Sequence, residues 1–456
     1  MENKKELTKD MTKGQPVKLL LFFALPLMLG SLFQQLYTMV DTIIVGQGVG
    51  INALASLGAA DWLNWMFVGL VTGLTQGFSI IFAQYYGAGD EKRLKAAIGN
   101  SIVLTAIAAL VFTVAGELTI TPVLMLLDTP SDIFAGAEQY LRVMLGGVTV
   151  SLMYNLEAAL LRALGDSKTP LMAMITAAVT NVVLDLLFVL VFKWGIIGAA
   201  SATIIAQAVS FVYCLNAIRK ISIVKIEKKD ISVHAQMSKK LLVVGIPIVF
   251  QNTVISVGGM ILQSVINSYG FLFVAGFTAA NKMYGLLETA ATSFGFAITT
   301  YTAQNLGAGD FMRIKKGMRS AVIMALLTSV AVSLIMLIFG KPILSLFISS
   351  ETGQVDEVLG IAYHYLSIMS YFLAVLYALH SYRSALQGLG NTVVPMLSGI
   401  AEFIMRTAAA LLLPRLIGQE GVFYAEILAW TAAAILLVTA YYINVNILHK
   451  KFSNSY

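Results

Sequence analysis

Four polar side chains lie in stretches of the chain that are otherwise almost wholly apolar. Asp41 is in the first such stretch, Asn181 and Asp185 are in the fifth, and Thr203 is in the sixth. Residues four apart share one face of a helix, so Asn181 and Asp185 would point the same way. Counted from the outer helix ends, Asp41, Asp185 and Thr203 would lie at similar depths of about 8–12 Å.

Two carboxylates held close together in a low dielectric cannot both ionise cheaply, so one takes up a proton or both share a cation. We therefore predict a cation-coupling site at Asp41, Asn181, Asp185 and Thr203, where the oxygen atoms of the first three could hold Na⁺. The alternative is two separate carboxylates, each satisfied by a local hydroxyl or backbone group.

Other ionisable residues also fall inside apolar stretches, where a charge costs about 2.5–3.5 kcal/mol and is by default a functional hypothesis. Glu288 is near the middle of the eighth stretch, and we expect it to bind a cationic substrate, as Asp41 and Asp185 would, or a second proton. Pairing with a polar neighbour is the alternative for Glu288. Glu402 and Arg406, spaced i, i+4, are expected to pair with each other.

No arrangement of residues for covalent or cofactor chemistry is apparent in the sequence. Cys214 is the only cysteine, which excludes an internal disulfide and a cysteine-based metal site. The sequence has no nucleophile–base constellation and no phosphate loop of the Gly-x-x-x-x-Gly-Lys-Ser/Thr type. We therefore expect no enzymatic activity, no cofactor other than a coupling ion (H⁺ or Na⁺), and no ATP hydrolysis.

These residues must be positioned by membrane-spanning helices. Of the 456 residues, 58% are hydrophobic and only 12% are charged, against about 25% charged in soluble domains. The apolar stretches are long enough to cross about 30 Å of hydrocarbon. We predict an all-α integral membrane protein with twelve spans, near 17–45, 54–82, 97–120, 134–161, 169–192, 195–218, 241–268, 274–303, 318–340, 358–386, 393–414 and 421–447.

The basic residues predict the orientation of these spans. With the N-terminus in the cytoplasm, 24 of the 30 Lys and Arg residues, Arg383 among them, fall on the cytoplasmic side and three on the other. This bias places both termini in the cytoplasm, in a bacterial-type cell membrane. The positive charge then indicates topology and contact with anionic lipid rather than nucleic-acid binding. We expect no cleavable signal peptide, because Met1–Lys18 is hydrophilic and a full span follows.

The chain contains an internal repeat with an offset of about 220 residues. The block Ala83–Asp90 returns as Ala303–Asp310 with the same Gln-x-x-Gly-Ala-Gly-Asp pattern, and Pro26 in the first span matches Pro247 in the seventh. Because each half has an even number of spans, the halves are related as a parallel repeat. We predict an N-terminal six-helix lobe at 1–218, a cytoplasmic linker at 219–240 and a C-terminal lobe at 241–456.

These motifs resemble the multidrug and toxic compound extrusion (MATE) family, over about residues 15–447. The resemblance rests on Pro26 through Val40-Asp41-Thr42, the doubled Gln-x-x-Gly-Ala-Gly-Asp loops and Leu161–Asp166. Within the family the chain is most similar to the bacterial branch that contains the staphylococcal multidrug exporter. The branch with sodium-binding acids in helices seven and ten is not matched.

The resemblance implies cation-coupled efflux of cationic amphipathic drugs or dyes through two six-helix lobes, with Asp41, Asn181, Asp185 and Thr203 as the N-lobe cation network. We predict an H⁺- or Na⁺-coupled antiporter that acts as a monomer, rearranges near Pro26, and has small organic cations and membrane lipid as partners. The alternatives are a lipid-linked oligosaccharide flippase of the same superfamily, disfavoured by the few intramembrane basic residues, and a passive channel.

Overall fold

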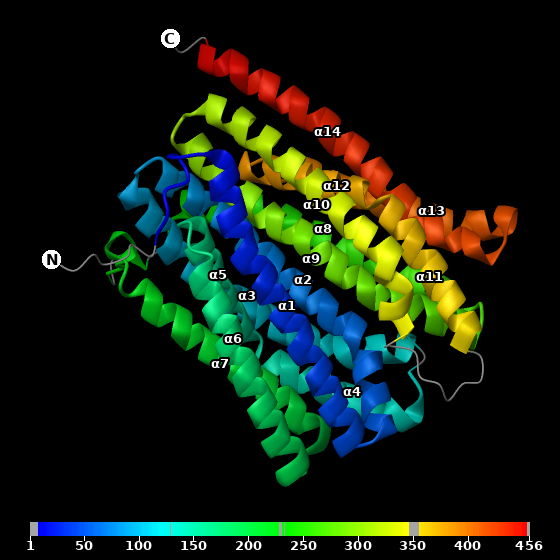
Figure 1. Ribbon diagram of the computed structural model, residues 1–456. Helices are drawn as coiled ribbons and strands as arrows, with labels where there is room; N and C mark the ends of the chain where they lie inside the picture. The colour runs from blue at the N-terminus through cyan, green and yellow to red at the C-terminus, as the bar shows by residue number, and fades with distance from the viewer. Residues whose placement is uncertain (1–7, 128, 228–229, 232, 346–354, 454–456) are drawn as a thin grey trace. The chain divides into compact units, whose positions relative to one another are not determined.

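The computed structural model describes residues 8–127, 129–227, 230–231, 233–345 and 355–453, and every regular element in these ranges is helical. The tail residues 1–7, predicted to be cytoplasmic, lie outside the described residues. The main helices (Figure 1) are α1 (Pro16–Gly48), α2 (Ile51–Gly87), α3 (Glu91–Leu126), α4 (Ser131–Gly146), α5 (Val148–Ala163), α6 (Lys168–Asp185), α7 (Gly195–Ile218), α8 (Ala235–Asn267), α9 (Phe271–Gly307), α10 (Phe311–Ser345), α11 (Val355–Tyr371), α12 (Leu373–Gly388), α13 (Val393–Ile417) and α14 (Tyr424–Ser453).

These helices account for each predicted span. Nine of the described helices are long and apolar enough to cross a membrane, and two bent pairs, α4 with α5 and α11 with α12, bring the number to eleven. The remaining span is α9, which has 37 residues but carries Asn281, Lys282 and Glu288 and is therefore less apolar. The bends of 51° within the two pairs were not predicted.

The internal repeat appears as matching local structure in both halves of the chain. Helices α2 and α9 each have 37 residues and each follows a glycine with positive φ, Gly50 or Gly270. After each of them, the Asp of the repeated loop (Asp90 or Asp310) accepts a hydrogen bond of 2.9 Å from the backbone N–H three residues on. A side-chain acceptor at this position satisfies a donor that the first helical turn leaves free. The repeated motif is thus an N-cap.

The helices form two compact units. Unit 1 comprises Met1–Met11 with Leu25–Val249, and unit 2 comprises Thr12–Ala24 with Phe250–Tyr456. Unit 1 includes the segment 219–240 that we predicted as a linker, and α1 passes from one unit to the other next to Pro26. The lobe boundaries at 218 and 241 remain a prediction.

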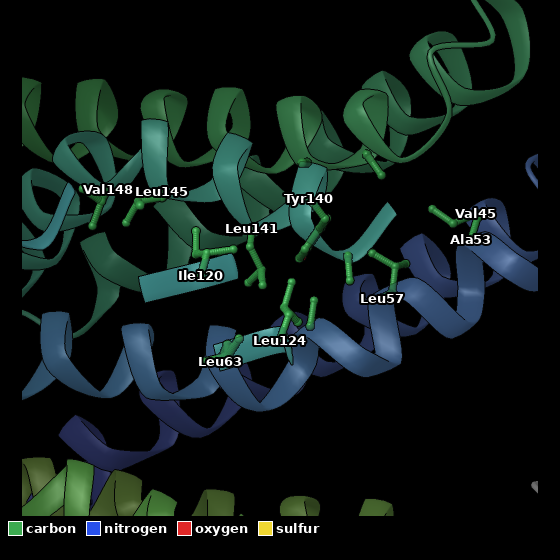
Figure 2. Close-up of a cluster of buried hydrophobic side chains, with 14 of the residues drawn as sticks. Val45, Ala53, Leu57, Leu63, Ile120, Leu124, Tyr140, Leu141, Leu145 and Val148 are labelled. Atoms are coloured by element: carbon green, nitrogen blue, oxygen red, sulfur yellow. The ribbon is translucent and has the colours of Figure 1, made fainter. Parts of the chain in front are cut away.

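The core of unit 1 includes side chains of α1, α2, α3, α4, α5 and α7. One buried cluster includes Val45 of α1, Leu57 of α2, Leu124 of α3, Leu141 of α4 and Val148 of α5, and Figure 2 shows these side chains spread along the space between the helices. Tyr140 lies in the same cluster. Burying such apolar side chains between helices fixes their rotation, and so fixes which polar residues face one another inside the unit.

The segment between α7 and α8 is docked against the start of α3. The side-chain oxygen of Asn100 accepts hydrogen bonds from the backbone N–H of His234 (2.8 Å) and the hydroxyl of Ser238 (3.0 Å). Next to it, a Cβ added to Gly99 would lie 1.8 Å from the backbone oxygen of Asp230. The absence of a side chain at Gly99 therefore permits this close approach.

Replacing Gly99 by alanine should displace the docked segment, because overpacking of this kind costs about 1–3 kcal/mol. We expect trypsin to cut the purified variant at Arg219–Lys225 about tenfold faster than wild type, in line with that cost. Gly58→Ala is the matched control, because a Cβ at this helical glycine meets nothing within 4 Å. Equal cleavage rates for Gly99→Ala and wild type would contradict this packing.

Candidate cation site

The structure brings Asp41 and Asp185 together inside unit 1. Asp41 belongs to α1, and Asp185 is the last residue of α6, where the chain continues as a π-helix over Leu186–Val191. Their carboxyl groups lie close enough to act on each other electrostatically. A π-helical turn inside a helix often marks a functional site, and nothing in the sequence distinguishes this turn from the α-helix before it.

Burial leaves these carboxyl groups short of partners. Asp185 has no solvent-accessible surface. Neither of its carboxyl oxygens, nor Oδ1 of Asp41, accepts a hydrogen bond from any donor among the described residues. Buried polar atoms nearly always have a partner, so three unsatisfied acceptors in one place require an explanation. A proton on one carboxyl group, or a cation held between the two, would supply the missing interaction.

Asn181 and Thr203 lie beside this pair. Asn181 is one turn before Asp185 on α6, is 1% exposed, and donates from Nδ2 to the hydroxyl of Thr203 on α7 over 3.4 Å. The Thr203 hydroxyl donates in turn to the carbonyl of Ala199. With its amide nitrogen engaged, Asn181 keeps a buried Oδ1 that accepts no hydrogen bond from the described residues. The atoms of Asp41, Asn181 and Asp185 that lack a hydrogen-bond partner are therefore all oxygens. Oxygen is the ligand type that hard cations prefer.

The described residues contain no group of three or more His, Cys, Asp and Glu that could hold a metal ion. A site for Na⁺ would instead combine carboxyl and amide oxygens of Asp41, Asn181 and Asp185. Proton binding needs only the carboxyl pair. The residues present fit either cation.

Three further residues lie near the pair and were not predicted to do so. Tyr37 and Tyr140 both interact electrostatically with the carboxyl groups of Asp41 and Asp185. Asp61 interacts in the same way with Asp41. Tyr37 is one helical turn before Asp41, a spacing that could have indicated it. Tyr140 comes from α4, and no local pattern connects it with α1 or α6.

In unit 2, Glu288 of α9 lies beside His380 of α12, with Oε1 and Nε2 3.4 Å apart. The Glu288 side chain is 36% exposed and that of His380 is 14% exposed. Neither distance along the chain nor periodicity predicts this contact, because the residues are on different helices.

The expected pairing of Glu402 with Arg406 is only a minor contact in a larger buried network. Glu402 accepts a close hydrogen bond from Arg383, whereas Arg406 is 3.9 Å from Glu402 and donates over 2.8 Å to Glu426. Arg383 is 7% exposed. Arg383, which we counted among the cytoplasmic charges, is therefore buried in unit 2 and neutralised by Glu402.

Pro26 lies inside α1, which is helical without interruption from Pro16 to Gly48. A proline within a helix leaves one carbonyl without its usual N–H donor and weakens the helix at that point. The position is therefore a place where α1 can bend at low cost.

Comparison with known proteins shows the family. Residues 26–187 and 247–412 match the family model described as MatE. The chain is 30% identical to the probable multidrug resistance protein YpnP of Bacillus subtilis, over 91% of this chain and 92% of that protein. It is 18% identical to the multidrug export protein MepA of Staphylococcus saprophyticus, over 94% of each chain.

Among solved structures, a MOP superfamily transporter from Pyrococcus furiosus has the same fold, with a TM-score of 0.90 and 24% identity over 98% of this chain and 100% of that one. The predicted fold, twelve transmembrane helices in two similar six-helix bundles, is confirmed. The two segments matched by the family model together cover more than half of the chain. This chain therefore belongs to the multidrug and toxic compound extrusion family, whose members are multi-pass membrane transporters rather than enzymes and have in general no cofactor.

Proposed function

We propose that this transporter exports small organic cations in exchange for H⁺ or Na⁺. The observation that carries the proposal is the buried Asp41–Asp185 pair, in which Oδ1 of Asp41 and both carboxyl oxygens of Asp185 accept no hydrogen bond from the described residues. A pair of acids in this environment binds a cation far better than two separate surface acids would, because the cation relieves their repulsion. Asn181, held by its hydrogen bond to Thr203, adds a buried amide oxygen to this set.

Coupling requires that the cation bind one conformation of the transporter better than the other. Occupancy of the Asp41–Asp185 pair changes the charge on α1 and α6, and α1 carries a proline in its interior. In the proposed cycle, the cation binds from outside, α1 rearranges near Pro26, and the organic cation leaves. The carboxylates of Asp41, Asp185 and Glu288 supply negative charge for a cationic substrate.

We infer the membrane orientation, the lipid contacts and the oligomeric state of the transporter from its sequence, as part of the same proposal. The excess of Lys and Arg on one side places both termini in the cytoplasm of a cell with a bacterial-type membrane. The same residues contact anionic lipid. The protein acts as a monomer and does not bind nucleic acid.

Transport in vesicles tests the proposal. The purified full-length protein is reconstituted, a proton or a sodium gradient is imposed separately, and ethidium is followed by fluorescence. We expect one of the gradients to drive ethidium accumulation in wild type, and Asp41→Asn to abolish it. Asp132→Asn, at an exposed position in the first turn of α4, is the matched control and should transport like wild type.

The outcomes separate the alternatives. Ethidium flux that follows its own gradient and is unaffected by Asp41→Asn would indicate a passive channel. Failure of both gradients to move ethidium in wild type would refute export of organic cations. A flippase for an anionic lipid-linked substrate is less compatible with unit 2, because the buried arginines Arg383 and Arg406 are already paired with carboxylates.

A further inference from the structure

Four charged residues form a closed ionic group inside unit 2. Arg383 of α12 pairs with Glu402 of α13, and Arg406 of α13 pairs with Glu426 of α14. None of these four side chains is more than 13% exposed. Arginine stays protonated in proteins, so the group holds two positive and two negative charges. It is neutral by itself.

Glu288 is a fifth charged residue in the same region and has no arginine of its own. Both guanidinium groups act on it electrostatically, but each makes its contacts with another carboxylate. The side chain in contact with Glu288 is His380, at 3.4 Å. With a neutral imidazole the six residues carry one net negative charge, and with an imidazolium they carry none. His380 therefore decides whether Glu288 has a counter-charge.

Glu288 is also the accessible member of this set. Its side chain is 36% exposed, against 5% for Glu402 and 13% for Glu426. A cation that enters unit 2 would reach Glu288 before any other carboxylate of the set. A carboxylate without a counter-charge attracts an opposite charge, so Glu288 favours the approach of a positive group when the imidazole is neutral.

The neighbouring helices place no other group that titrates near neutral pH against the pair, among the residues that the structure describes. Histidine is the side chain whose charge normally changes between pH 5 and 8. The described charges of α10 lie near its ends, at Arg313–Arg319 and Lys341. Arg383, Arg406 and Tyr284 act on Glu288 electrostatically. The other charged and titratable side chains of this region contact neighbours of the pair: Tyr365 on α11, Tyr377 on α12, Glu402 on α13 and Glu426 on α14.

We propose that Glu288 and His380 form a second cation site, in which the His380 imidazolium and a monovalent organic cation compete for the Glu288 carboxylate. When His380 is neutral, Glu288 binds the organic cation. When His380 takes a proton from solution, the imidazolium occupies the carboxylate and the organic cation leaves. The six residues are neutral in both states, so the exchange buries no uncompensated charge. This inference rests on the proposed export of organic cations and names how their release in unit 2 is regulated.

Equilibrium binding of ethidium to the full-length protein in detergent tests the competition. The measurement is made in the Asp41→Asn/Asp185→Asn background, which removes titration of the first site. Between a pH of about 8 and about 5.5, we expect ethidium affinity to fall about tenfold with His380 present. In the same background, His380→Gln should bind equally tightly across that range, and Glu288→Gln should bind weakly throughout.

His364→Gln is the matched control, because His364 is 46% exposed on α11 and faces Glu420 rather than Glu288. It should keep the pH dependence. Competition also predicts that ethidium binding releases a proton from His380, up to one per dye, under conditions in which the imidazole is protonated before the dye binds. Calorimetry in two buffers of different ionisation enthalpy measures this release without any change at His380, so misfolding of His380→Gln would not block the test.

An unchanged pH dependence in His380→Gln, absence of proton release, or absence of ethidium binding at any pH would overturn this inference. Failure of the proposed antiport gives a different pattern. In that case neither gradient drives ethidium into vesicles, while binding in detergent keeps its dependence on His380.

Discussion

Asp185→Asn is expected to lower gradient-driven ethidium export strongly while leaving the protein folded. Asparagine has the same shape as aspartate, so the packing at the end of α6 is kept, but the carboxyl pair becomes a single acid with an amide donor beside it. A single acid no longer needs a shared cation. Coupling energies between two ligands are typically worth a factor of about 5–150, and we expect cation-dependent export to fall by a factor in this range, measured as initial rate in vesicles.

Thermal unfolding in detergent distinguishes coupling from a structural role. The side-chain amide that Asp185→Asn introduces can donate to Asp41, whose Oδ1 accepts no hydrogen bond from the described residues in wild type. Satisfying a buried acceptor is stabilising, so the midpoint of Asp185→Asn should equal or exceed that of wild type. A lower midpoint together with normal export would show that Asp185 serves the fold and not the exchange.

The spans could be predicted from the sequence because each is a long apolar stretch bounded by polar loops. The repeat could be predicted because the Gly-Ala-Gly-Asp loop needs glycine at Gly89 and Gly309, where φ is 67° and 73°, and an N-cap at the Asp that follows. The approach of Asp41 and Asp185 was expected from their similar depth, since two polar groups at one level in a bundle tend to meet.

Contacts that depend on helix rotation could not be predicted. Arg383 and Glu402 lie 19 positions apart on two helices, and their contact is decided by how α12 and α13 turn toward each other. The same holds for Glu288 with His380 and for Tyr140 beside Asp41. The bends between α4 and α5 and between α11 and α12 also lack a proline at the break, since Gly147 and Phe372 occupy those positions.

Arg383→Met should destabilise the protein strongly. The substitution leaves Glu402 buried, with Arg406 at 3.9 Å as its remaining cationic contact. Breaking a buried ion pair from one side typically costs about 3–5 kcal/mol, because the other charge stays buried without compensation. We expect the free energy of unfolding, measured by chemical denaturation in mixed micelles, to fall by about this amount.

The double variant Arg383→Met/Glu402→Met tests whether the loss comes from the unpaired charge. It removes both members of the pair and fills the space with apolar side chains, and such replacements are often neutral or stabilising. We therefore expect it to recover most of the stability lost in the single variant. Arg142→Met is the matched control, because Arg142 pairs with Glu117 and Glu138 at an exposed position and should matter far less. Equal losses in Arg383→Met and Arg142→Met would mean that Glu402 is hydrated, and the neutral ionic group that isolates Glu288 with His380 would then not exist.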